Sequence, residues 1–180
     1  LSILEKKVQK RDYGCQIFWV DAPLYYHSNR GLPSLYESLL SQTERPCLFY
    51  NDPELIKDLA HALKRNNIRT SILKELVHIQ GVCGLIFRGS LDRARNYHKV
   101  TLSRAEFRLY DGDESQFLNH PSLSGVVSAG ANLAPRAWQR ITGSSLNQRE
   151  DQKAYPDYLH QVWEAGTYLR NMMDVWAPWM

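Results

Sequence analysis

The sequence has only three cysteines among its 180 residues, at positions 15, 47 and 83, and no CxxC pair. An odd and scattered set argues against a disulfide framework or a zinc site. The six histidines show no ligand spacing such as HxxxH, so we expect no metal site. Isolated cysteines within apolar runs are typical of reduced, buried thiols, and we therefore predict a cytoplasmic protein.

The sequence also lacks a strong charge bias, a long apolar run and a glycine-rich phosphate loop. Its 22 basic and 19 acidic side chains are interspersed and give a net charge of +3, which argues against a nucleic-acid partner. No apolar stretch approaches the length that spans a bilayer, so we expect no membrane partner. Neither GxGxxG nor GxxxxGK[ST] occurs, and we predict that the protein uses no cofactor.

Apolar residues instead gather in short segments of about strand length. These segments are rich in β-branched and aromatic residues, and most are continuously apolar, as in parallel strands that are covered on both faces. They are Gln16–Ala22, Pro46–Tyr50, Val82–Phe87, Phe107–Asp111 and Gly125–Ala129.

Helical patterns lie between these segments, which indicates βαβ units and a parallel sheet. Pro53 is well placed to start one helix, Thr70 or Ser71 to cap the next, and Ser90 to cap the one after. The spacing favours a (β/α)8 barrel of which about five of the eight units are present, with the other three expected upstream of Leu1. An open doubly wound sheet is the alternative. We predict a barrel portion over residues 1–145 and a helical extension over residues 146–180.

Five motifs give this chain a family resemblance. In order and spacing they resemble the dihydrodipicolinate synthase and N-acetylneuraminate lyase family of class I aldolase-like barrels, from the family's fourth strand to its eighth. They are APLYY (22–26), CLFYNDP (47–53), GLIFRGS (84–90), YDGDE (110–114) and GVVSAGANLAP (125–135).

The resemblance implies an aldolase or lyase that acts on pyruvate or a related 2-oxo acid. In the family, a strand lysine forms an imine with the ketone, and a tyrosine relays protons to and from the reacting oxygen. Tyr50 matches the relay tyrosine of the YN-x-P motif. Tyr25 matches, with a shift of about one residue, a tyrosine that reaches the neighbouring subunit's site. Each of the two tyrosines has packing as its alternative role.

The resemblance also assigns substrate-binding positions later in the chain. Asp113 and Glu114 match the loop that holds substrate hydroxyl groups in the neuraminate lyase branch, although acidic loop residues are commonly just solvated. Val127 matches the position whose backbone carbonyl lies near the bound keto acid, and a core role is its alternative. Leu55 stands near the place of a carboxylate-binding arginine in true dihydrodipicolinate synthases, which argues against lysine biosynthesis.

The main departure from the family is at Ile86, which occupies the position of the imine-forming lysine. Isoleucine is no nucleophile, and Lys74 and Lys99 fall in helical segments. If the strand continues to Arg88, the period of two places that side chain on the same face as Ile86, where a guanidinium can bind a carboxylate but form no imine.

Three functions are therefore open from the sequence. The chain is a pyruvate-class aldolase or lyase that is impaired or inactive as written, a non-catalytic relative that binds a 2-oxo acid or a partner protein, or an incomplete barrel without autonomous activity. The resemblance implies a small 2-oxo acid such as pyruvate as the ligand, and a homo-oligomer, either a dimer or a tetramer.

Overall fold

The structure is a computed structural model, and it describes residues 2–11, 17–59, 65–121, 124–146 and 156–176. The chain divides into two compact units, Leu1–Leu109 and Tyr110–Met180. Within the described ranges, every helix is too short or too polar to cross a membrane. The division at residues 145 and 146 that the sequence suggests stays a prediction.

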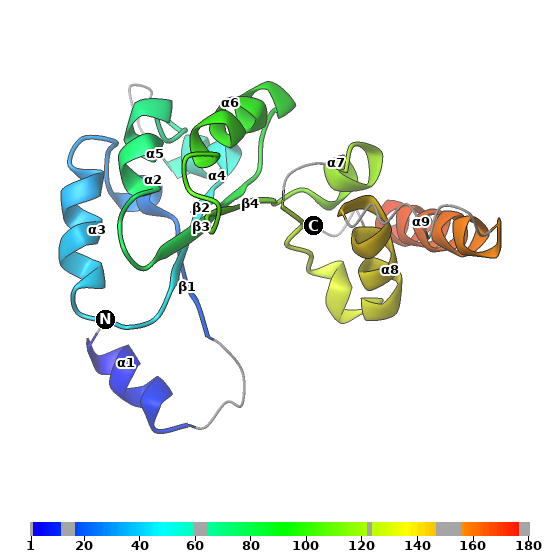
Figure 1. Ribbon diagram of the computed structural model, residues 1–180, viewed down its shortest axis with the longest axis horizontal. Helices are drawn as coiled ribbons and strands as arrows, with labels where there is room; N and C mark the ends of the chain where they lie inside the picture. The colour runs from blue at the N-terminus through cyan, green and yellow to red at the C-terminus, as the bar shows by residue number, and fades with distance from the viewer. Residues whose placement is uncertain (1, 12–16, 60–64, 122–123, 147–155, 177–180) are drawn as a thin grey trace. The chain divides into compact units, whose positions relative to one another are not determined.

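Parallel strands alternate with helices in the first unit (Figure 1). β1 pairs in parallel with β2, and β2 with β3, so that the sheet order β1-β2-β3-β4 follows the chain. A doubly wound sheet reverses its strand order, whereas a barrel keeps it, so the order identifies part of a barrel. The elements are α1 (Ser2–Gln9), β1 (Trp19–Asp21), α2 (Pro23–Tyr26), α3 (Leu32–Leu40), β2 (Cys47–Asn51), α4 (Pro53–Leu59), α5 (Thr70–Leu76), β3 (Val82–Phe87), α6 (Leu91–Thr101) and β4 (Arg108–Asp111).

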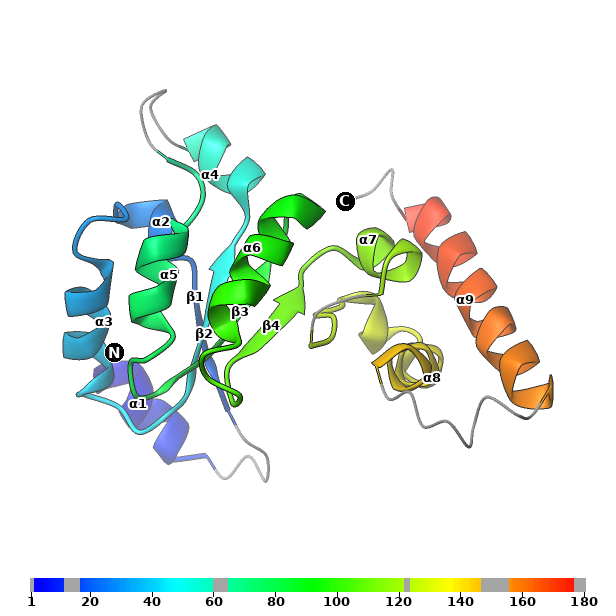
Figure 2. The same cartoon turned by 45° about the horizontal axis from the view of Figure 1, so that its top comes forward.

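One face of this sheet is covered by helices, with α5 between α3 and α6 (Figure 2). The Tyr36 ring of α3 meets the Phe49 ring of β2 edge to face at 4.6 Å, and the Tyr97 ring of α6 meets the Phe87 ring of β3 at 5.0 Å. All four rings are at most 2% exposed. Phe49 and Phe87 point toward the helices. Because side chains alternate between the two faces of a strand, the residues next to them along β2 and β3 point to the other side of the sheet.

Asn51 fastens the helical layer to the end of β2. Its side chain is fully buried, and its Oδ1 accepts a hydrogen bond from the Ile68 amide at 2.8 Å. The Tyr97 hydroxyl donates to the Ile68 carbonyl at 2.6 Å. A buried polar group is tolerated where it is paired, and this network fixes the segment that leads into α5.

Gly84 allows the strands to approach closely in the middle of the sheet. A Cβ at this position would lie 2.4 Å from the backbone oxygen of Arg108 and 2.9 Å from the Leu48 Cδ2. Neither distance is possible for a side-chain carbon, so β3 requires glycine where β4 passes it.

The second unit is a helical cluster around Trp138. Phe117 and Leu118 from α7, Trp138 and Ile141 from α8, and Leu169 from α9 form its core. Its elements, after the end of β4, are α7 (Glu114–Asn119), η1 (Gly130–Asn132), α8 (Pro135–Leu146) and α9 (Pro156–Trp176).

The predicted elements are confirmed in most places. Pro53 starts α4, and the Ser90 hydroxyl caps α6 by accepting the Arg93 amide at 3.4 Å. The predicted cap at Thr70 or Ser71 is wrong, because both residues lie inside α5, whose preceding residue makes no side-chain cap.

Four of the five apolar segments contain the strands, and Gln16 of the first segment lies outside the described residues. The fifth, Gly125–Ala129, forms one parallel bridge between Val126 and Asp111 instead of a strand of its own. Two backbone hydrogen bonds join it to Asp111, and among the described residues no further strand pairs with its other side.

Candidate functional site

The side of the sheet opposite the helices carries Tyr50 and Ile86 as direct neighbours. The two residues are paired in the register of β2 and β3. Paired residues of parallel strands present their side chains on the same face, and both stand near the carboxyl ends of their strands, where barrel enzymes place their sites.

The Tyr50 hydroxyl donates a hydrogen bond to the Asp52 Oδ2 at 3.2 Å. The pKa of Tyr50 is raised above its ordinary value, first because the ring is half-buried and then because the Asp52 carboxylate opposes a negative phenolate. Tyr50 is therefore held in its neutral form, with its proton directed to a carboxylate of the same chain.

Arg88 completes a polar cluster at this place. Its amide donates to the Asn51 carbonyl at 3.0 Å, so the ladder continues one residue past the end of β3. Its Nη1 lies 3.7 Å from the Asp52 Oδ2, and its positive charge partly offsets the raised pKa of Tyr50. The expected orientation of Arg88, on the same side as Ile86, is consistent with these contacts. The Arg88 side chain is 55% exposed and accessible to a ligand.

Asp52 organises this cluster, and the sequence analysis did not single it out as a site residue. Its Oδ1 accepts the amides of Glu54 and Leu55 at 3.0 and 3.3 Å, which caps α4. Its Oδ2 faces Tyr50 and Arg88. The signal was present in the sequence, because an aspartate directly before a proline is a strong helix-start pattern, and its second oxygen was then available to the site.

Ile86 is only 4% exposed, so a hydrocarbon fills the position that a lysine would need. The lysines among the described residues are Lys6, Lys7, Lys10, Lys57, Lys74 and Lys99, and each lies on a helix or in the turn after α1. In the part of the chain that the structure describes, no strand carries a primary amine.

Tyr25 lies on α2, just after β1, with 51% of its surface exposed. Its neighbour Tyr26 and the buried Tyr36 both donate to the Asp21 Oδ2. Burial and the Asp21 hydrogen bond raise the pKa of Tyr26 to about 12. Tyr26 and Tyr36 thus anchor α2 and α3 to the end of β1, while Tyr25 projects from an exposed position.

Asp113 and Glu114 lie in the second unit, and each carboxylate has a local structural partner. Asp113 is the N-cap of α7, where its side chain accepts the Gln116 amide at 2.8 Å. The Glu114 Oε1 accepts the Gly130 amide at 2.9 Å. These bonds fix the turn into α7 and the start of η1, and the predicted substrate-binding role stays a prediction.

Val127, also in the second unit, is 45% exposed, so the alternative of a core residue does not hold for its side chain. Its amide donates to the Asp111 carbonyl at 2.9 Å. The Asp111 side chain is fully buried, and burial raises the pKa of its carboxyl above the ordinary value. Its acceptor oxygens are used by the Asp113 amide and the Gln116 side chain.

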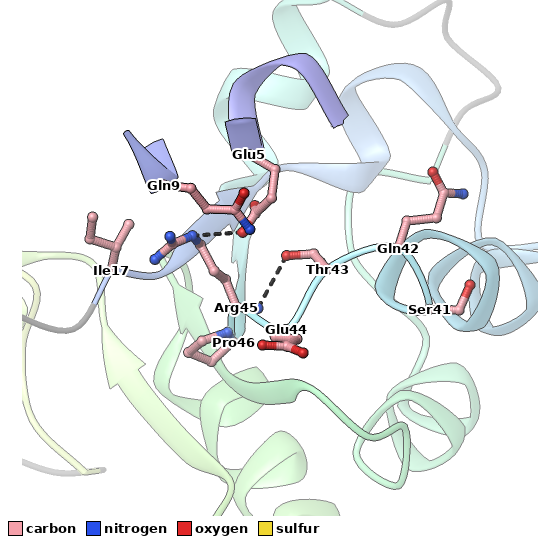
Figure 3. Close-up of a pocket in the computed structure, with 9 residues that line it drawn as sticks. All are labelled: Glu5, Gln9, Ile17, Ser41, Gln42, Thr43, Glu44, Arg45 and Pro46. Atoms are coloured by element: carbon pink, nitrogen blue, oxygen red, sulfur yellow. Dashed lines mark hydrogen bonds and ion pairs between the residues drawn. The ribbon is translucent and has the colours of Figure 1, made fainter. Parts of the chain in front are cut away.

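A separate hollow of about 710 Å³ lies at the opposite, amino end of β2 (Figure 3). An ion pair of 2.8 Å joins two of its lining residues, Glu5 and Arg45. The Thr43 hydroxyl oxygen accepts a hydrogen bond from the Arg45 amide. It contains none of the expected site residues. No cluster of His, Cys, Asp and Glu side chains that suits a metal ion occurs in the described ranges.

A family model described as the dihydrodipicolinate synthetase family matches residues 4–168. Among curated proteins, the 4-hydroxy-tetrahydrodipicolinate synthase of Herminiimonas arsenicoxydans is 23% identical over 77% of this chain and 46% of its own length. The enzyme of the same name from Aromatoleum aromaticum is 30% identical over 68% of this chain and 40% of its own length. The chain thus spans less than half the length of these two relatives.

A solved structure shares the fold. The dihydrodipicolinate synthase of Acinetobacter baumannii, described as chloride-inhibited and complexed with pyruvate, superposes with a TM-score of 0.69 at 18% identity. The match covers 97% of this chain and 54% of the other. At this identity the likeness shows the fold alone.

Proposed function

Because the chain belongs to the dihydrodipicolinate synthetase family but carries a buried isoleucine beside Tyr50, we propose that it binds a 2-oxo acid without forming an imine. The fold is that of a class I aldolase, and the site is the cluster of Tyr50, Asp52, Ile86 and Arg88. The observation that carries the proposal is the register pair of Tyr50 and Ile86, which puts a hydrocarbon next to the tyrosine.

Arg88 is the ligand-binding group of this proposal. A guanidinium matches the planar geometry of a carboxylate with two parallel hydrogen bonds, and Arg88 stands half-exposed at the end of β3. Ile86 provides an apolar surface beside it for the methyl end of a small keto acid such as pyruvate. Asp52 competes for the same guanidinium, so we expect weak binding.

The position of the Tyr50 proton argues against a relay role. A relay tyrosine must exchange its proton with the reacting oxygen. Here the hydroxyl donates to Asp52, and the raised pKa of Tyr50 disfavours its release. Two features therefore impair the aldolase or lyase activity of the family in this chain. One is the missing amine at position 86, and the other is the Tyr50 hydroxyl, whose hydrogen bond goes to Asp52.

Titration of pyruvate into the chain, followed by NMR shift changes of the Arg88 and Ile86 amides, tests the proposal. Hydrogen bonds to a charged group contribute about 1.5 to 3 kcal/mol, so Arg88→Gln should weaken binding by about tenfold or more. Arg95→Gln is the matched control, because Arg95 pairs with the exposed Asp92 on α6 at 3.7 Å.

Wild-type binding that only Arg88→Gln weakens supports a 2-oxo-acid site. Absence of binding by the wild type rejects it and favours a partner-binding relative or an incomplete barrel without autonomous activity. Equal weakening by both substitutions rejects it in favour of non-specific attraction to surface charge.

A further inference from the structure

A hollow of about 550 Å³ in the first unit collects positive charge outside the site described above. Neither Tyr50, Asp52 nor Arg88 lines it, and three of its seven lining residues are arginines while none is acidic. The lining residues are Ser28, Asn29, Arg30, Gly31, Arg65, Arg69 and Ile72. Its volume lies within the range of pockets that hold small molecules.

The Asn29 side chain connects the two loops that line this hollow through hydrogen bonds. The Asn29 Nδ2 donates to the Asn67 carbonyl at 3.0 Å, and the Asn29 Oδ1 accepts the Arg69 amide at 2.7 Å. Asn29 itself is only 7% exposed. The loop that carries Arg30 is therefore fastened to the loop that carries Arg65 and Arg69, and the three cations are held around one space.

The charge of the hollow is not compensated locally. Arg30, Arg65 and Arg69 are all exposed, and no ion pair connects any of them to a carboxylate of the described side chains. In a chain of net charge +3, three arginines around one space form a local concentration of positive charge.

We propose that this hollow binds a small anion with two or more negative charges, of the chemical class of phosphate esters. Arginine forks bind phosphate oxygens in pairs, and three of them around one space suit a dianion better than a single carboxylate. Ile72 adds an apolar wall for the carbon part of such a molecule. This site is independent of the proposed 2-oxo-acid site, and either one can fail without the other.

Isothermal titration of the chain with inorganic pyrophosphate tests the site. The double variant Arg30→Gln and Arg69→Gln, which leaves the backbone bond of residue 69 to Asn29 intact, should weaken binding by about tenfold or more. Arg65→Gln alone should weaken it less. Arg95 lies outside the hollow and pairs with Asp92 on α6, so Arg95→Gln is the matched control and should keep wild-type affinity.

Four results would overturn the proposal. The wild type could show no binding of pyrophosphate, or Arg95→Gln could weaken binding as much as the double variant, which would indicate diffuse surface charge. Tighter binding of a single-stranded oligonucleotide than of pyrophosphate would indicate a nucleic-acid surface instead. Titration with citrate separates phosphate recognition from a general preference for polyanions, and equal affinity for citrate would reject the phosphate class.

Discussion

At the scale of single residues, Asp52 determines the electrostatics of the site. One of its oxygens caps α4 and the other faces both the Tyr50 hydroxyl and the Arg88 guanidinium. The carboxylate therefore faces the cation of the cluster and accepts the hydrogen bond of the Tyr50 hydroxyl. In this chain a residue that begins a helix also sets the state of the site.

Asp52→Asn should lower the pKa of Tyr50 toward its ordinary value. The substitution removes the negative charge that opposes the phenolate, and it keeps Arg88, whose charge favours the phenolate. Asparagine also caps helices, so the fold should persist. NMR titration of the Tyr50 ring resonances measures the change, with the exposed Asp92→Asn as control. An unchanged pKa of Tyr50 would show that burial alone raises it.

The sequence predicted that Tyr50, Ile86 and Arg88 lie near one another at the strand ends, but not the hydrogen bonds of this cluster. The YN-x-P motif indicated Tyr50, the GLIFRGS motif indicated Ile86, and the strand period indicated Arg88. The sequence did not reveal that Asp52 bonds to Tyr50, or that Asp113 and Glu114 hold local amides, because such partners depend on the direction of a side chain after a turn. An acidic residue in a loop gives the same sequence pattern whether it caps a helix or binds a ligand.

At the scale of elements, the first unit depends on close packing between its strands and helices. Gly84 lets β4 approach β3, and the pairs Tyr36 with Phe49 and Phe87 with Tyr97 seal the helical face. Continuous apolar segments predicted strands that are covered on both faces, but only β3 is buried at nearly all positions, whereas β1, β2 and β4 keep half-buried or exposed residues. The segments could not predict that the segment 125–129 would form only a bridge, because strand formation requires partners on neighbouring strands as well as propensity.

Gly84→Ala should destabilise the fold by about 1 to 3 kcal/mol, because the new Cβ would overlap a backbone oxygen that cannot move alone. Gly143→Ala on α8 is the matched control, since no atom lies within 4 Å of its added Cβ. That change should be neutral or stabilise by about 0.5 to 1 kcal/mol, because alanine loses less entropy in a helix. Urea unfolding of both variants compares them, and an equal effect would contradict the close approach of β4.

Alkaline pH should weaken the fold through its buried tyrosines. Burial raises the pKa of Tyr36 and Tyr97 above 10.0, so above that pH the folded chain holds protons that the unfolded chain releases. The contribution is complete below the ordinary tyrosine pKa and is lost progressively as the pH rises from there toward the raised pKa of the folded chain. The free energy of unfolding should therefore fall between about pH 9 and about pH 12.

The Tyr97→Phe variant measures how much Tyr97 contributes to this loss of stability at alkaline pH. It leaves the Ile68 carbonyl without its donor, which should cost about 1 to 3 kcal/mol at neutral pH, and it should make the alkaline loss less steep. Tyr168→Phe, at a 57% exposed position, should change neither quantity. Urea unfolding across the pH range provides the measurement, and an unaltered slope for Tyr97→Phe would refute the assignment.

At the scale of the whole molecule, the sheet has an open edge. Among the described strands β1 pairs only with β2, and Phe18 and Val20 are 40% and 57% exposed there. An exposed strand edge with apolar side chains tends to pair with another chain. The order of the strands along the sheet was predictable from the alternation of elements.

The chain on its own should therefore associate into species larger than its monomer mass of 20.9 kDa. Val20→Lys should shift the population toward monomer, because a charge on an edge strand opposes pairing. Leu102→Lys, at a 68% exposed position after α6, is the control and should not. Analytical ultracentrifugation over a range of concentrations distinguishes the species. A wild-type monomer at every concentration, or equal shifts by both variants, would contradict association through β1.

Because no described strand carries a primary amine, we expect no imine with pyruvate, and reductive trapping measures this. The chain is incubated with pyruvate and borohydride and its intact mass is measured. The Ile86→Lys variant serves as the positive control, since a buried amine beside Tyr50 should have a lowered pKa and react. The account predicts an unchanged mass for the wild type and a pyruvate adduct for the variant. A stable adduct on the wild-type chain, at any lysine, would contradict it.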